Sequence, residues 1–165
     1  GEARAGEGSV TGVARAYIAL GSNLGDREAT IRDAVAELDC EPGIAVVAVS
    51  RLVDTEPVGV VDQPRFLNGV AAVDTELAAA DLLAVLLEVE RRFGRRREGA
   101  VLQGPRTLDL DLILYGDAVI HEPGLVVPHP RLHEREFVLG PLAEIAPGLE
   151  VPGKGKVETL RARLH

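Results

Sequence analysis

The segment with the clearest chemical pattern is GPRTLDLDLILY, residues 104–115. Its alternation of leucine with other residues predicts a β-strand whose leucines point into a core. Asp109 and Asp111 then share the opposite face with Ile113 and Tyr115, with the two aspartate Cα atoms about 7 Å apart. Two carboxylates this close repel each other unless a cation lies between them, and Mg²⁺ prefers such oxygen ligands together with phosphate and water. The segment therefore predicts phosphoryl-transfer chemistry, against the alternative of an edge strand with a solvated acidic face.

Arginine side chains crowd the sequence on the N-terminal side of these aspartates. Only two of the 18 basic residues are lysines, and six arginines fall close together: Arg91, Arg92, Arg95, Arg96, Arg97 and Arg106. The planar guanidinium suits bidentate contact with phosphate. A solvated helix end whose positive charges interact with the helix dipole is the alternative, and residue types alone leave both open.

The elements that must position these side chains alternate in a simple order. Hydrophobic periodicity predicts strands over residues 13–20, 44–53, 66–75 and 108–115, helices over 26–38, 82–93 and 137–145, and a long loop over 54–65. Asp26 is the predicted N-cap of the first helix and Gly94 the predicted end of the second. This order predicts an α+β fold, a ferredoxin-like βαββαβ plait with an antiparallel sheet, helices on one face and extra C-terminal elements. The other face would be free for a site covered by loops.

Composition indicates one globular domain. The chain has 165 residues, a net charge of -8 and 46% hydrophobic residues. We expect a flexible leader over residues 1–12 and a single domain over 13–165. The acidic balance argues against nucleic-acid binding, and we find no apolar run of membrane-spanning length. Cys40 is the only cysteine, which excludes an internal disulfide and favours a packed thiol in a reducing compartment. We expect a cytoplasmic monomer with small-molecule partners.

The common nucleotide-binding motifs are missing. The sequence has no Gly-x-x-x-x-Gly-Lys-Ser/Thr loop and no Gly-x-Gly-x-x-Gly after a strand. A bound nucleotide would therefore be held by arginines and a carboxylate-bound metal.

Five separated blocks resemble the 6-hydroxymethyl-7,8-dihydropterin pyrophosphokinase family, in the family's order. They are YIALGSNLG (17–25), TEPVG (55–59), DQPRFLN (62–68), GPRTLDLD (104–111) and VPHPR (127–131). The resemblance covers about residues 16–149. It implies transfer of pyrophosphate from ATP to the hydroxymethyl group of 6-hydroxymethyl-7,8-dihydropterin, with release of AMP, in folate biosynthesis. It also implies two Mg²⁺ ions.

The resemblance assigns a role to each matching residue. Metal ligands are matched by Asp109 and Asp111, and positions that assist phosphoryl transfer by Arg95 and Arg106. Further ATP-contacting positions are matched by Glu90, Arg97, Arg106, His129 and Arg135, and pterin-contacting positions by Thr55, Val58, Phe66, Asn68 and Phe137. The chemistry agrees, because a flat heteroaromatic ring can stack between two phenylalanines while Asn68 offers both donor and acceptor. Core packing is the alternative for each phenylalanine.

Three positions depart from the family pattern. Gln103 stands where many members have tryptophan, Glu56 where proline is frequent, and Pro130 where some have tyrosine. These changes concern loop closure and substrate affinity rather than metal binding. Two other functions stay open: a pterin- or nucleotide-binding module without catalysis, and a metal-dependent phosphoryl transferase with another acceptor.

Overall fold

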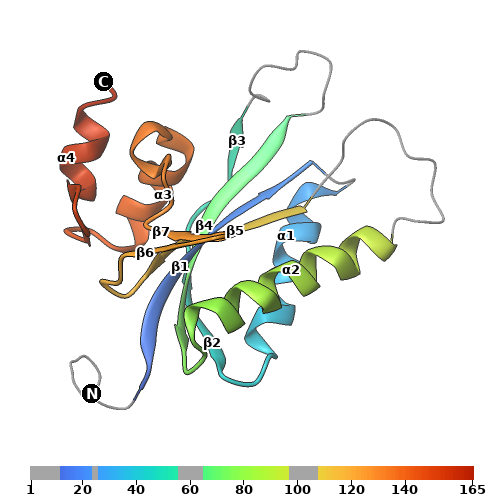
Figure 1. The fold of residues 1–165 in the computed structure, drawn as a ribbon. Coiled ribbons are helices and arrows are strands. Elements are labelled where there is room, and N and C mark those ends of the chain that lie inside the picture. The colour runs from blue at the N-terminus through green and yellow to red at the C-terminus, as the bar shows by residue number, and fades with distance from the viewer. Residues whose placement is uncertain (1–11, 24–25, 56–64, 97–107) are drawn as a thin grey trace.

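The structure, a computed structural model, describes residues 12–23, 26–55, 65–96 and 108–165, without the side chains of 95 and 96. The predicted leader therefore lies outside the described residues, apart from Gly12. In chain order the elements (Figure 1) are β1 (Ala14–Ser22), α1 (Arg27–Asp39), β2 (Ile44–Val49), β3 (Val53–Thr55), β4 (Phe66–Thr75), α2 (Ala79–Arg96), β5 (Leu108–Tyr115), β6 (Ile120–Glu122), β7 (Leu125–Val127), the 3-10 turn η1 (Leu132–Glu134), α3 (Glu136–Ile145), β8 (Glu150–Val151), β9 (Gly155–Lys156) and α4 (Val157–Ala162).

The main sheet is antiparallel throughout, with strand order β2-β4-β1-β5 and β3 paired to β4. The predicted antiparallel sheet is thus confirmed. The predicted end of the first strand at Leu20 is wrong, because Gly21 and Ser22 pair with both β4 and β5. β1 therefore continues into the neighbourhood of the aspartates.

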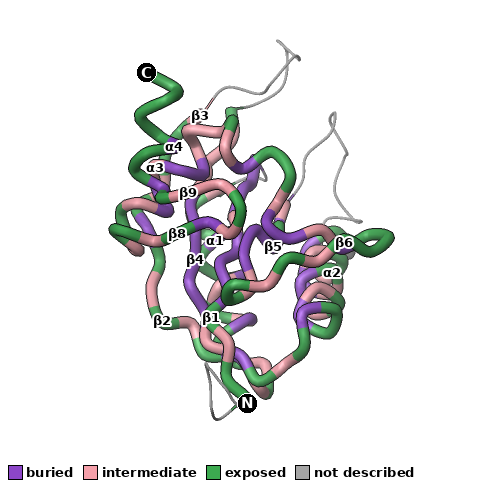
Figure 2. The backbone as a smooth tube through the Cα atoms, turned by 60° about the vertical axis from the view of Figure 1, so that its left-hand side comes forward, coloured by how far each residue is buried: buried purple, intermediate pink, exposed green. Residues whose placement is uncertain are grey.

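Both faces of this sheet carry a hydrophobic core. One face packs against α1 and α2, through side chains such as Ile31, Leu38 and Leu86. The other face packs against α3 and α4, through Leu139, Leu142 and Leu160. Figure 1 shows the two helix pairs on opposite sides of the strands, and Figure 2 shows the buried strands between them. The expectation that loops alone cover the second face is therefore wrong, since a C-terminal layer occupies much of it.

A break divides the strand predicted over residues 44–53 into β2 and β3. The Ser50 hydroxyl accepts a hydrogen bond from the Val70 N–H at 2.9 Å and donates one to the Arg51 carbonyl at 2.8 Å. The Ser50 side chain thus binds a β4 N–H that a backbone carbonyl of the neighbouring strand would otherwise bind. Gly69 leaves room for Ser50 and Leu52 at this break, because a Cβ there would lie 2.7 Å from Leu52 and 3.0 Å from the Ser50 hydroxyl.

α1 and α3 lie within one residue of their predicted ends, whereas α2 extends three residues beyond its predicted range at each end. Asp26 caps α1, with its carboxylate accepting from the Ala29 N–H at 3.1 Å. Gly94 does not end the second helix, since α2 continues to Arg96. Cys40, expected to be packed, is exposed. No helix in the described ranges is long and apolar enough to cross a membrane.

Candidate active site

A β-bulge in β5 separates the aspartate-bearing half of the strand from its C-terminal half. Tyr17 of β1 pairs with Leu114 and Ile18 with Leu112, so Ile113 is an extra residue. Before the bulge the leucines are buried on the α1–α2 side, as predicted, and the aspartates face the other side.

Beyond the bulge the predicted alternation is wrong. Leu114 joins the core beneath α3 and α4, and Tyr115 packs on the α1–α2 side, where its hydroxyl donates to the Leu77 carbonyl. The extra residue reverses the faces of the two positions that follow it. Of the predicted companions of the aspartates, Ile113 keeps its place beside them and Tyr115 does not.

The aspartates line a cavity of about 420 Å³ between the sheet, η1 and α3. Every pterin residue predicted within the described ranges lines the same cavity: Thr55, Phe66, Asn68 and Phe137. The charged and polar part of its lining, called the charged end below, consists of Asp109, Asp111, His129, Arg131, Glu134 and Arg135. One hollow thus combines aromatic and apolar walls with charged groups, as a flat ring with a reactive substituent would require.

Asn68 is held at both ends of its side-chain amide. Its oxygen accepts from the Thr55 hydroxyl, and its nitrogen donates to the Leu20 carbonyl at 3.5 Å. Gly21 lies opposite Asn68 in the β1–β4 register, and a Cβ on Gly21 would lie 2.8 Å from the amide nitrogen. The glycine therefore makes room for this amide at the cavity wall.

The two phenylalanines are only partly buried and both face the cavity. Phe137 lies in the first turn of α3 and also packs against the core beneath that helix, so it combines the two roles considered for it. The Arg135 guanidinium lies 5.6 Å from its ring centroid, a cation–π contact. Core packing alone does not account for either residue.

A second hollow of about 290 Å³ adjoins the first, since Asp111 and His129 line both. Apolar side chains of α2, β5 and β7 form much of its wall, with Glu90 at its edge. The Glu90 carboxylate accepts from the Leu110 N–H at 2.6 Å, between the two aspartates in sequence. Burial raises the pKa of Glu90, the charges of Asp109 and Asp111 raise it further, and the Leu110 N–H opposes the shift.

The acidic groups around β5 fit a cation that is shared with a phosphorylated ligand. Within the described ranges, no set of three histidine, cysteine or acidic side chains forms a complete metal site. Asp109 and Asp111 can therefore offer carboxylate oxygens to Mg²⁺, while phosphate and water complete the coordination shell.

His129 is fixed as a neutral N–H donor. Its Nδ1 accepts from the Arg131 backbone N–H at 3.1 Å, so the proton of the neutral ring belongs on Nε2. Burial lowers the pKa of His129, the positive charges of Arg135 and Arg131 lower it further, and Asp111 opposes them. A neutral imidazole with its lone pair engaged can donate to an anion and is not free to accept a proton.

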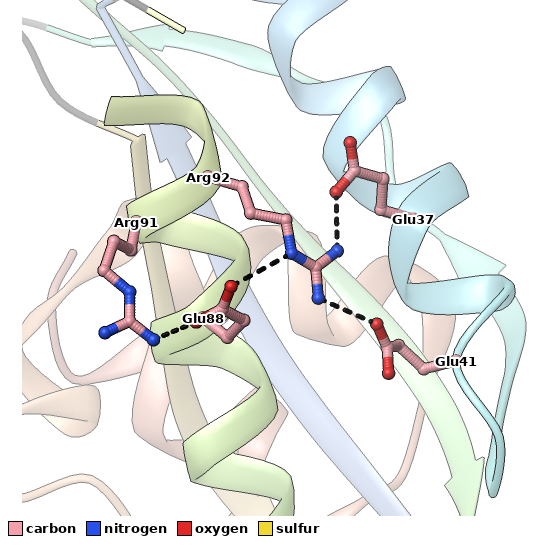
Figure 3. A network of polar contacts seen from close by, with 5 residues as sticks. All are labelled: Glu37, Glu41, Glu88, Arg91 and Arg92. Carbon is pink, nitrogen blue, oxygen red and sulfur yellow. Dashed lines mark hydrogen bonds and ion pairs between the residues drawn. The ribbon is translucent and has the colours of Figure 1, made fainter. Parts of the chain in front are cut away.

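Two arginines of the predicted patch, Arg91 and Arg92, form ion pairs with nearby carboxylates. Arg92 bridges Glu37 and Glu41 of the α1 end at 3.1 Å each and Glu88 of its own helix at 3.3 Å. Arg91 pairs with Glu88 only on the helix surface (Figure 3). Arg92 therefore fastens α2 to the α1 end, Arg91 pairs within α2, and neither lines either hollow. The remaining predicted positions lie outside the described residues: Arg97, Arg106, Val58, Glu56, Gln103 and the side chains of Arg95 and Arg96.

Arg131 and Glu134 line the charged end of the cavity and were not predicted. Their side chains form an ion pair of 3.1 Å. Arg131 could have been predicted from its place at the end of the VPHPR block, whereas no sequence feature pointed to Glu134.

The sequence and the fold are both similar to those of known proteins. Residues 17–147 match the family described as 7,8-dihydro-6-hydroxymethylpterin-pyrophosphokinase. Two curated relatives are named 2-amino-4-hydroxy-6-hydroxymethyldihydropteridine pyrophosphokinase. The Pseudomonas aeruginosa protein is 46% identical over 151 residues, covering 91% of this chain and 92% of the relative. The Bacillus subtilis protein is 48% identical over 135 residues, covering 82% and 80%.

Solved structures with the same fold include wild-type Plasmodium falciparum HPPK-DHPS with pteroate. Its TM-score is 0.66 at 12% identity, covering 92% of this chain and 42% of that one. A triple mutant of the same protein gives a TM-score of 0.67 at 13% identity. The chain spans less than half the length of these structures, and the likeness concerns the fold alone. With the family match and the curated relatives, the chain belongs to the 7,8-dihydro-6-hydroxymethylpterin-pyrophosphokinase family.

Proposed function

We propose that the protein transfers pyrophosphate from ATP to the hydroxymethyl group of 6-hydroxymethyl-7,8-dihydropterin and releases AMP, in folate biosynthesis. The observation that carries this proposal is the meeting of two hollows at Asp111 and His129. A reaction between a heteroaromatic alcohol and a nucleotide needs two adjoining sites with anion-handling groups at their junction.

The pterin occupies the larger cavity in this proposal. Its ring lies between Phe66 and Phe137, and its amide edge faces Asn68, whose own amide is already oriented by Thr55. The hydroxymethyl group then points towards the charged end. ATP occupies the smaller, apolar hollow beside Glu90 and directs its phosphates to the junction.

Asp109 and Asp111 would hold two Mg²⁺ ions, which when bound supply positive charge to the phosphates and fix the in-line geometry. The residues fit this group, because both carboxylates lie in the cavity and a third carboxylate, Glu90, lies behind the same strand. His129 donates its Nε2–H to a phosphate oxygen and does not act as the base, because its Nδ1 lone pair is engaged by Arg131.

Several assignments follow from family membership. Arg95 and Arg106 assist phosphoryl transfer, Arg97 and Arg135 contact ATP, and Val58 contacts the pterin. The strand order β2-β4-β1-β5, with α1 and α2 on one face, supports a ferredoxin-like plait. A cytoplasmic monomer remains our prediction.

The decisive experiment incubates the protein with ATP, Mg²⁺ and 6-hydroxymethyl-7,8-dihydropterin and identifies the nucleotide product. We expect AMP in equal amount to the pterin diphosphate, and none when the pterin is omitted. A preparation of the Asp109→Asn/Asp111→Asn double variant, purified in the same way, controls for contaminating kinases. Formation of ADP would indicate transfer of a single phosphoryl group instead of pyrophosphate, and AMP formation with other alcohols only would indicate a different acceptor. Tight ATP binding without turnover would indicate the binding module.

A further inference from the structure

We propose that Arg131 is a product-binding residue that holds the diphosphate once it is on the pterin, and that Glu134 is the counterion of Arg131 before the diphosphate is present. This inference rests on the proposed function and names the group that occupies the charged end of the larger cavity. Arg131 and Glu134 line that cavity together with Asp109, Asp111 and Arg135.

The backbone that carries Arg131 is firmly placed. Its N–H donates to His129 Nδ1 at 3.1 Å, and its carbonyl accepts from the Glu134 N–H at 3.0 Å. The next residue, Leu132, is fully buried and anchors η1 in the core beneath α3. The origin of the Arg131 side chain is therefore fixed beside His129, although the side chain itself is exposed.

The side chain of Arg131, in contrast, is held by a weak contact. Its Nε lies 3.1 Å from a Glu134 carboxylate oxygen, and the two side chains are 64% and 50% exposed. Exposed ion pairs of this kind contribute little and exchange readily for a better anion. The guanidinium has further N–H donors that this contact does not use, and they suit a diphosphate bidentately.

The charges of the two pterins indicate when Arg131 exchanges Glu134 for a ligand. The pterin alcohol is uncharged at its reactive end, so it offers nothing that competes with Glu134. The diphosphate ester carries several negative charges at the same place, and with Mg²⁺ on Asp109 and Asp111 it still presents free oxygens to Arg131 and Arg135. Arg131 therefore distinguishes the product from the alcohol within one cavity.

The test compares binding of the two pterins to the Arg131→Ala variant. We expect the KM for the alcohol to stay within about twofold of the wild type. By calorimetry, with Mg²⁺, the Kd of the pterin diphosphate should rise about tenfold, the effect of losing a charge-assisted contact. Arg131→Lys should recover part of this loss. Glu134→Gln should lower the Kd of the diphosphate about threefold, because the competing carboxylate is gone.

A matched pair of controls is available on α1. Arg32 and Glu28 form an ion pair of 2.9 Å with 64% and 59% exposed side chains, and neither lines the cavity. Arg32→Ala and Glu28→Gln should change neither constant. An unchanged diphosphate Kd in Arg131→Ala, or equal weakening for alcohol and diphosphate, would overturn the inference even if the wild type makes AMP. A wild type that makes no AMP would instead contradict the proposed function.

Discussion

Negative charge around β5 is the dominant feature at the scale of single residues. Asp109 and Asp111 face the cavity, and Glu90 approaches the same strand from α2 through the Leu110 N–H. The sequence indicated the first two as a pair but gave no reason to bring Glu90 to their strand. The raised pKa of Glu90 reflects burial first and the two aspartates second. Such a cluster favours binding of cations and of ligands that carry them.

Replacing either aspartate should abolish most turnover without unfolding the protein. We expect Asp109→Asn and Asp111→Asn each to lower kcat by about 10²–10⁴-fold, because charge stabilisation and positioning supply most of the rate in phosphoryl transfer. The melting temperature of Asp111→Asn without Mg²⁺ should not fall, since one repelling charge has been removed, and Asp109→Asn should still unfold in one cooperative transition. Rapid-quench measurement of AMP together with thermal unfolding tests both expectations. Near-normal kcat in both variants would contradict the metal assignment.

His129 should make folding stability depend on pH in a defined direction. Its pKa is lowered from 6.5 in the folded protein, so the unfolded chain binds more protons as pH falls. The stabilisation is complete above 6.5 and is lost as pH falls through the lowered folded pKa. We therefore expect the free energy of unfolding of the wild type, minus that of His129→Gln, to decrease between about pH 8 and pH 5.5. A difference that increases towards acid would contradict the shift.

At the scale of elements, the positions of helices and strands could be predicted from the sequence wherever they depend on residues close together in the chain. The period of Ile31 and Leu38 predicts α1, and the residues of β4 were predicted from end to end. The break at Ser50 and the bulge at Ile113 were not predictable, because each depends on the partner strand: Val70 for the first, and the β1 register for the second.

The candidate site also contains residues that the sequence predicted and residues whose roles depend on distant partners. The pterin residues of the described ranges were predicted through their motifs and do line one cavity. Arg91 and Arg92 were grouped with the phosphate-binding arginines because their place in the sequence could not reveal that Glu37 of α1 and Glu41, just after α1, pair with Arg92.

The register of β1 against β4 can be tested at Gly21. In Gly21→Ala the new methyl would lie 2.8 Å from the Asn68 amide nitrogen, so the amide must turn away from its Thr55 and Leu20 partners. We expect the KM for the pterin to rise about tenfold, as when a polar substrate edge loses its partner, with the KM for ATP nearly unchanged.

Gly94→Ala provides the matched control, because a Cβ there meets nothing within 4 Å and lies inside α2. It should leave both KM values unchanged and stabilise the protein by about 0.5–1 kcal/mol. Equal KM values in the wild type and Gly21→Ala would show that Asn68 does not read the pterin edge.

The contact between α1 and α2 can be tested with two adjacent arginines. Arg92→Ala removes two carboxylate contacts that reach across to Glu37 and Glu41, together with one contact to Glu88 within α2, whereas Arg91→Ala removes one contact within α2 (Figure 3). We expect Arg92→Ala to lower the melting temperature clearly more than Arg91→Ala, and the gap to narrow in 1 M salt because screening weakens ion pairs. Equal melting temperatures of the two variants at low salt would show that the contacts of Arg92 with Glu37 and Glu41 do not stabilise the protein.

At the scale of the whole molecule, the cavity joins two packing layers. β3 and β4 supply Thr55, Phe66 and Asn68, while the C-terminal layer supplies Arg135 and Phe137. A ligand that contacts both layers should therefore couple their stability.

Binding of the pterin diphosphate should thus protect the C-terminal layer from local opening. At a concentration about 100 times Kd, we expect about 2.7 kcal/mol of added stability. Hydrogen exchange should slow in η1 and α3 more than in α1, which does not line the cavity. Exchange that slows in α1 alone would contradict this coupling.

The layer formed by α3 and α4 also bears on how the protein is made. During synthesis the sheet, the aspartates and Asn68 emerge from the ribosome before Phe137, and α3 packs with α4, which follows it in the chain. A nascent chain that has not yet released α3 therefore has both aspartates but only one aromatic wall for the pterin. Substrate capture becomes possible only after α3 and α4 have emerged, so a shorter nascent chain would not withhold pterin from finished enzyme molecules.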